Sequence, residues 1–154
     1  MSEKKSFASK TDQIKKIAEH WRVILEKEHE KLDIQFKWFP QAACSAASTI
    51  LFWALRHEGF DARIVTVCSE SRYFSHAWVI VEDLHIDITG DQFSASDPLY
   101  PPPVYVSTQL PEWSRGLPPK PYSEDDNADA NIRDNYNQLI EKYGRIKFYH
   151  PVVE

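Results

Sequence analysis

The sequence has few basic residues, no long apolar run and little cysteine. Lys and Arg number 18 against 23 Asp and Glu, which gives the 154 residues a formal net charge of -5 at pH 7. Proteins that hold nucleic acid through its phosphates need an excess of Lys and Arg. The charge therefore argues against nucleic acid as a partner.

Two further absences concern membranes and disulfides. No apolar run approaches the roughly 20 residues of a membrane-spanning helix, and residues 1–16 are polar, without the apolar stretch of a secretory signal. The 2 cysteines give no disulfide framework. We expect a protein of the reducing cytoplasm without membrane contact, or one exported by a route that needs no signal peptide.

The apolar content is sufficient for one domain over residues 1–154. Hydrophobic residues make up 42% of the chain and charged residues 27%, as in globular proteins. A chain of this length buries about two-thirds of the surface that it exposes when unfolded. The sequence contains no internal repeat and gives no indication of the oligomeric state.

Hydrophobic periodicity predicts two helices and then three strands. Residues 9–33 repeat apolar side chains at helical spacing and predict an amphipathic helix. Residues 43–58 are rich in Ala and Leu and predict a buried helix that ends at Gly59. Three short β-branched runs predict strands, the last two as a hairpin: residues 62–68, 77–81 and 84–88.

The second half of the chain divides into a proline-rich segment and a third helix. Residues 97–121 hold eight of the ten prolines, which favours an extended covering segment with one strand at 104–107. Residues 123–154 begin with acids, continue with helical periodicity up to Gly144, and end in a strand or tail.

Three residues in this order are suited to thiol chemistry: Cys44 at a helix start, His76 on a strand and Asp87 on the next strand. A free thiol has a pKa near 8.5, but a helix N-terminus and a nearby imidazolium both stabilise the thiolate. A carboxylate can hold the imidazole in one tautomer. Asp87 lies between two isoleucines, where burial without a partner would be costly, so we expect it to be paired.

The hairpin pattern places His76 and Asp87 together. An even turn at residues 82–83 puts both on one face of the hairpin with Trp78. The other face is wholly apolar and is typical of a core: Ala77, Val79, Val81, Leu84, Ile86 and Ile88. We expect the polar face to meet the helix that carries Cys44.

The longer motif resembles a known superfamily. The strings FPQAACSAAS and SHAWVIVEDLHIDITGDQF, within residues 39–93, are similar to the transglutaminase-like branch of the papain-like cysteine proteases, and in particular to bacterial members with HAW and DIT-x-DQF motifs. The resemblance implies an α+β fold, with helices packed on a small antiparallel sheet and the nucleophile at a helix N-terminus. It also implies Cys44 as nucleophile, His76 as general base and acid, and Asp87 as the residue that orients His76.

The residue that would stabilise the oxyanion is left open. Papain-like peptidases carry a Gln several residues before the Cys, whereas Gln41 is three residues before it. Gln41, Gln92 and the backbone N–H of Cys44 are the candidates. Trp78 either lines a substrate groove or packs in the core. Ser45 and Ala46 also depart from the Gly or Asp of related sequences.

The implied function is a thiol-dependent amide hydrolase or acyl transferase acting on a protein or peptide. A peptidase would transfer the acyl group of a backbone amide to water, a deamidase that of a glutamine side chain to water, and a transglutaminase would transfer it to an amine. The sequence does not separate these reactions. The chemistry needs no metal or organic cofactor.

Other interpretations of the same residues remain open. Cys44 can be a small buried residue of an Ala-rich helix, and Cys68 a structural one. Zinc could bind Cys44, Cys68, His76 and Asp87, although their spacing matches no close-knuckle pattern. Asp91 is a competing acid that could instead cap a turn. The alternative function is a non-catalytic interaction module that keeps this fold and binds a partner through its proline-rich segment.

Overall fold

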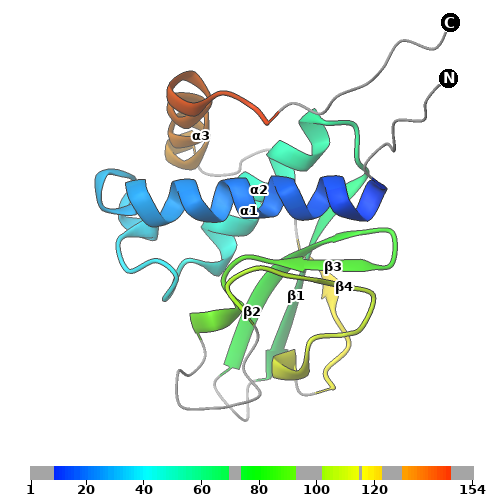
Figure 1. The fold of residues 1–154 in the computed structure, drawn as a ribbon. Coiled ribbons are helices and arrows are strands. Elements are labelled where there is room, and N and C mark those ends of the chain that lie inside the picture. Colours follow the sequence, from blue (N-terminus) through cyan, green and yellow to red (C-terminus); the bar gives the residue numbers. More distant parts are fainter. Residues whose placement is uncertain (1–8, 70–73, 93–101, 115, 123–129, 147–154) are drawn as a thin grey trace, which may run out of the picture.

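A computed structural model describes residues 9–69, 74–92, 102–114, 116–122 and 130–146. These residues form an α+β fold in which three helices pack on a five-stranded antiparallel sheet (Figure 1). The helices are α1 (Lys10–Glu28), α2 (Cys44–His57) and α3 (Ala130–Tyr143). The strands are β1 (Ala62–Ser69), β2 (Phe74–Val81), β3 (Leu84–Asp87), β4 (Tyr105–Ser107) and β5 (Lys120–Pro121). Among the described helices, none combines the length and apolar character required to cross a membrane.

The strands follow the order β4-β3-β2-β1-β5. β2 and β3 form the predicted hairpin through a two-residue turn in which Glu82 has a φ of 56°. A left-handed residue in such a turn matches the right-handed twist of the strands. Val79 pairs with Ile86, and this register confirms that His76 and Asp87 share one face of the hairpin.

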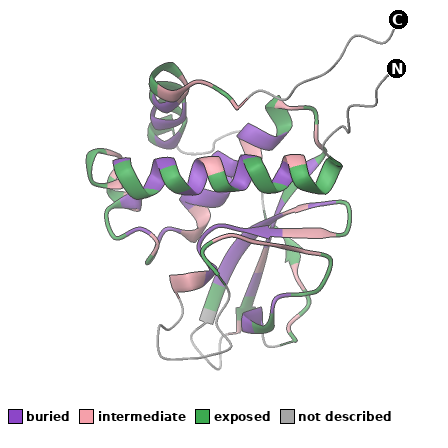
Figure 2. Cartoon of the chain, viewed as in Figure 1, coloured by how far each residue is buried: buried purple, intermediate pink, exposed green. Residues whose placement is uncertain are grey.

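The helices cover the apolar face of this sheet. The side chains of Ala77, Val79 and Ile86 belong to the main core, together with residues of all three helices. Figure 2 shows buried residues on α1, α2 and the strands where they meet. Tyr136 of α3 stacks on Trp21 of α1, with ring centroids 5.4 Å apart.

The expectation that the polar face of the hairpin meets the helix of Cys44 is therefore wrong for the body of this helix. α2 carries almost no charge before Arg56, so its body gains more by burying apolar surface against the apolar face of the sheet. Cys44 is at the first turn of α2, and it contacts His76 from this helix end rather than across the polar face.

The proline-rich segment covers the opposite face of the sheet. β4 pairs with β3 at one edge and β5 pairs with β1 at the other, so the chain between them crosses the sheet. Trp113, on the single turn η5 (Glu112–Ser114), packs there in a second, smaller core with Val65, Val67 and Trp78. The described part of the segment thus lies over this face, and β4 falls within the strand expected at 104–107.

Several elements differ from the sequence prediction; β2, for example, begins at Phe74 instead of residue 77. The first helix ends at Glu28 and tightens into a 3-10 turn over His29–Lys31, instead of continuing to residue 33. β5 was not expected because it has only two residues; its Pro121 is tolerated at the edge of a sheet. The acidic run 123–129 and the tail 147–154 lie outside the described residues.

Candidate active site

Cys44 is the first residue of α2, and the turn before it leaves the helix start uncapped. The residue at the N-cap position is Ala43, which has no side-chain acceptor. The first backbone N–H groups of α2 therefore have no side-chain cap, and the helix dipole favours negative charge at this end. Ala42, just before, has a φ of 54°, a left-handed conformation that costs energy for any residue with a Cβ.

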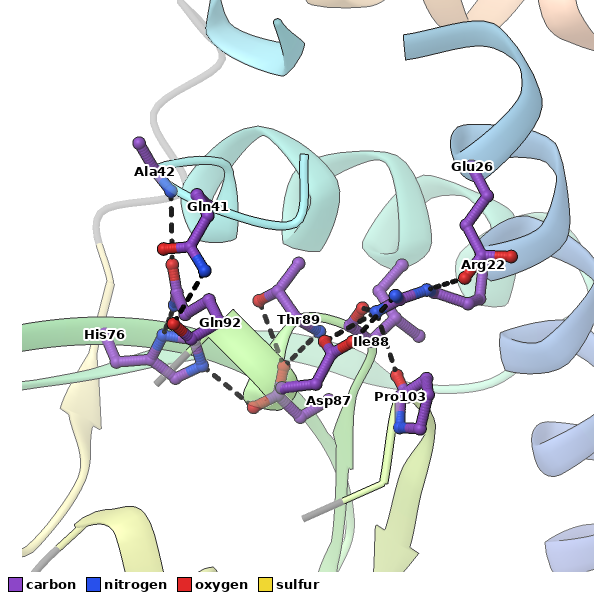
Figure 3. Close-up of polar contacts among 11 residues, drawn as sticks. Arg22, Glu26, Gln41, Ala42, His76, Asp87, Ile88, Thr89, Gln92 and Pro103 are labelled. Carbon is purple, nitrogen blue, oxygen red and sulfur yellow. Dashed lines mark hydrogen bonds and ion pairs between the residues drawn. The ribbon is translucent and has the colours of Figure 1, made fainter. Parts of the chain in front are cut away.

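His76 and Asp87 form a buried pair (Figure 3). His76 Nε2 lies 2.8 Å from Asp87 Oδ2, and each residue is only 1% exposed. The second oxygen of Asp87 accepts hydrogen bonds from the backbone N–H and the hydroxyl of Thr89, at 2.8 and 3.2 Å. With Oδ1 bonded to Thr89, Oδ2 of Asp87 is left to accept the Nε2 hydrogen of His76.

The Cys44 thiol is half-buried and hydrogen-bonds to His76. Burial by itself raises the pKa of Cys44, but the hydrogen bond and charge of His76 and the backbone N–H of Ala77 lower it more, so the net pKa is below that of a free thiol. Burial likewise lowers the pKa of His76, but the charge and hydrogen bond of Asp87, followed by Cys44, raise it to about 9. The two groups thus favour a thiolate beside an imidazolium.

Gln92 and Gln41 also lie at this site. Gln92 is on the short turn η4 (Gly90–Gln92), and its side-chain nitrogen lies 2.6 Å from His76 Nδ1. The Gln92 side-chain oxygen accepts the backbone N–H of Ala42 at 3.2 Å, and its backbone oxygen accepts Gln41 Nε2 at 2.9 Å (Figure 3). Of the two glutamines named as oxyanion candidates, Gln92 thus contacts the imidazole directly, and Gln41 contacts Gln92.

Trp78 is completely buried and does not line a groove. It is 0% exposed and packs in the core under the proline-rich segment, where its Nε1 donates to His85 Nδ1 at 3.0 Å. Of the two roles expected for Trp78, lining of a substrate groove is therefore wrong, and packing in the core is the role that the structure shows. The pKa of His85 is lowered, and burial is the main cause.

Trp113 is a site residue that the sequence did not identify. Its ring meets that of His76 edge to face, with centroids 4.4 Å apart and planes at 79°. Its ring also lies against Trp78, 4.7 Å between centroids. An isolated aromatic among prolines gives no sign of such a contact in the sequence, because the contact depends on the path of the segment across the sheet.

Arg22 is the second residue that the sequence did not identify. It is buried on α1, and both its terminal nitrogens donate to the carboxylate of Asp91, at 2.7 and 2.8 Å. It also donates to the backbone oxygen of Ile88 at 2.8 Å. Arg22 therefore holds the turn that joins Asp87 to Gln92. The sequence did contain a signal for Arg22: it is a charged residue next to Trp21, within the apolar stripe of α1.

The sequence named two further candidates, a structural role for Cys68 and a metal site. Cys68 is exposed near the end of β1, opposite Ser75, so it contributes little to the core. Within the ranges that the structure describes, no three His, Cys, Asp or Glu side chains are grouped so as to hold a metal ion.

Comparison with known proteins identifies no relative. No family model, curated protein or solved structure matches the chain. What this chain does is therefore inferred from the geometry of Cys44, His76 and Asp87.

Proposed function

We propose that this protein is a thiol-dependent amide hydrolase or acyl transferase that uses Cys44, His76 and Asp87. The observation that carries the proposal is the contact between a thiol at an uncapped helix N-terminus and a buried imidazole–carboxylate pair. Each part of this arrangement lowers the cost of forming a thiolate or of protonating a leaving group. A purely structural cysteine needs none of them.

Acylation would begin with attack of the Cys44 thiolate on the carbonyl carbon of an amide. A C–S bond forms as the carbonyl π electrons move to the oxygen. Backbone N–H groups at the start of α2, among them that of Cys44, would be candidate donors to the negative oxygen. When the C=O bond re-forms, the C–N bond breaks and the amine leaves with the proton of His76 Nδ1.

Deacylation would return the site to its starting state. His76, now neutral, takes a proton from a water or amine that attacks the thioester carbon. The C–S bond breaks, the thiolate leaves, and the acid or new amide is released. Asp87 keeps Nε2–H in place throughout, so Nδ1 remains the nitrogen that gives and takes the proton.

The fold assignment that accompanies this proposal is a papain-like or transglutaminase-like fold. The order of Cys, His and Asp along the chain, the Cys at a helix start and the His and Asp on neighbouring antiparallel strands support it. The motifs FP-x-x-x-C and HAW with IDIT-x-DQF, which resemble that superfamily, support it as well.

Acyl transfer can be tested without knowing the substrate, by using p-nitrophenyl acetate. We expect one acetyl group on Cys44, seen as an adduct on the intact chain, with a burst of p-nitrophenol. Cys44→Ala should remove the adduct, and His76→Ala should slow its formation. Acetylation on other residues, or at a rate indifferent to both substitutions, would contradict the proposal and favour an interaction module.

The acceptor can then be identified by mass spectrometry of a mixture of peptides and a small primary amine. Cleaved peptides would indicate a peptidase, a gain of about 1 Da on glutamine a deamidase, and addition of the amine a transglutaminase. The Cys44→Ala chain is the control for each product.

A further inference from the structure

The side chain of Gln92 bridges the turn before α2 and the catalytic histidine. Its carboxamide oxygen faces the backbone N–H of Ala42 at 3.2 Å, and its nitrogen faces His76 Nδ1 at 2.6 Å (Figure 3). A carboxamide has one accepting end and one donating end. The two contacts therefore restrict which end of Gln92 can face the imidazole.

The identity of these neighbours determines the proton positions. A backbone N–H can only donate, so the oxygen of Gln92 faces Ala42 and the NH2 group faces His76. Nδ1 must then accept a hydrogen bond. On the other side of the ring, Asp87 accepts from Nε2 at 2.8 Å. The form of the site that has this hydrogen bond therefore contains the neutral Nε2–H tautomer of His76, and it competes with the imidazolium form that Asp87 and Cys44 favour.

Nδ1 is also the nitrogen that Cys44 needs. Because Asp87 occupies Nε2, the hydrogen bond between Cys44 and the ring is left to Nδ1. One lone pair cannot accept a hydrogen from Gln92 and at the same time carry a proton from the thiol. Transfer of the thiol proton therefore requires that the Gln92 amide turn away.

We propose that Gln92 is a positioning residue whose amide caps Nδ1 of His76 and so shifts part of the resting Cys44–His76 pairs from thiolate and imidazolium to thiol and neutral imidazole. This inference rests on the proposed function and adds its regulation. A protonated thiol is a weaker nucleophile than a thiolate and is less open to oxidation. The cap would thus keep the resting cysteine less reactive.

Gln92 and the other polar groups that face the ring have opposite effects on the pKa of His76. Asp87 from β3 and Cys44 from α2 are the titratable groups that favour the imidazolium. Trp78 and Trp113, whose rings also contact His76, carry no charge. A hydrogen bond to Nδ1 favours the neutral ring, because that bond is lost when Nδ1 is protonated. Removing the Gln92 amide should therefore favour the imidazolium and the thiolate.

The direct test is the pKa of His76 measured by NMR in a Cys44→Ala chain, with and without Gln92→Leu. Leucine keeps much of the volume and leaves the backbone oxygen that accepts Gln41. We expect Gln92→Leu to raise the pKa of His76 by roughly 0.5 to 1 unit, the equivalent of one ordinary hydrogen bond. An unchanged or lower pKa would overturn the proposal.

Gln41→Leu is the matched control. It removes a side-chain hydrogen bond to the same turn but leaves the Gln92 amide on Nδ1. We expect the pKa of His76 to stay unchanged in this variant. An equal rise in Gln41→Leu would mean that loosening of η4, rather than loss of the cap, causes the effect, and would also overturn the proposal.

A second readout uses chains that retain Cys44. With Cys68 replaced by alanine, Gln92→Leu should increase alkylation of Cys44 by iodoacetamide several-fold at about pH 6, since more thiolate is present. Alkylation indifferent to His76 in a chain with intact Gln92 would overturn the proposed function instead. The two failures are therefore distinguishable.

Discussion

Against the opposing effect of burial, Asp87 is the residue that does most to raise the pKa of His76. The carboxylate is buried, bonded to Thr89 and 2.8 Å from the imidazole. We expect Asp87→Asn to lower the pKa of His76 and to slow alkylation of Cys44 near pH 6 about tenfold, the effect of one pKa unit. Alkylation rates across pH measure this effect.

Asp91→Asn is the control for this substitution. It also removes one carboxylate near the site, but Asp91 binds Arg22 rather than His76. We expect alkylation of Cys44 to change little. If both variants slowed it equally, general loss of negative charge would explain the result, and the specific role of Asp87 would be contradicted.

The pH dependence of acylation follows from the same residues. Against the opposing effect of burial, His76 lowers the pKa of Cys44, and Asp87 and Cys44 raise that of His76 to about 9. As pH rises, acylation should increase through the lowered pKa of the thiol, reach a plateau, and fall above about 9 when the imidazolium loses its proton. Acylation rates with an acyl p-nitroanilide, whose leaving group is an amine, measure it across pH. A rate that first rises above pH 9 would contradict the ion pair.

Single residues were predictable only where the sequence carried a pattern. Cys44, His76 and Asp87 followed from their order and from the parity of the hairpin. Arg22 and Trp113 did not, because their roles depend on tertiary contacts: an ion pair from α1 to η4, and an aromatic contact across the sheet.

At the scale of elements, the ion pair between Arg22 and Asp91 connects α1 to η4. Arg22→Met keeps the length of the side chain but leaves the Asp91 carboxylate without these two hydrogen bonds. Because Asp91 is partly exposed, we expect a loss of about 2 kcal/mol in the free energy of unfolding, less than for a fully buried pair. Urea denaturation measures it.

The double variant Arg22→Met with Asp91→Asn tests the cause. If the loss of the guanidinium from the Asp91 carboxylate is responsible, the double variant should recover part of the lost stability. A double variant as unstable as the sum of the single variants would show that packing of the arginine, not its charge, matters.

Element boundaries were predictable where turn residues marked them. Gly59 ends α2 with a φ of 90°, and the N–H of Phe60 bonds to the oxygen of Leu55, as in a glycine-capped helix. The face of the sheet that α2 covers was predicted wrongly. The alternation along a strand shows which side chains share a face, but it does not show which helix packs on that face. β5 was missed because its pairing with β1 is long-range.

At the scale of the whole molecule, the proline-rich segment closes the face of the sheet that the helices leave open. Trp113 is the large side chain that fills this layer, packed against Trp78 and His76. We expect Trp113→Ala to lower the free energy of unfolding by about 3 kcal/mol, as for other large-to-small substitutions in a core.

Trp38→Ala is the matched control for the loss of an indole. Trp38 is 63% exposed, so its removal should change the stability by no more than about 0.5 kcal/mol. Urea denaturation of both variants provides the comparison. Equal stability of the two variants would contradict the assignment of the second core.

The central claim is that Cys44 and His76 share a proton. The most direct measurement is the alkylation rate of Cys44 by iodoacetamide across pH, in a Cys68→Ala chain, with and without His76→Ala. We expect a rate that is already high near pH 6 and that collapses without His76. A slow rate that rises only toward about pH 8.5, whether or not His76 is present, would identify an ordinary thiol and contradict the proposed function.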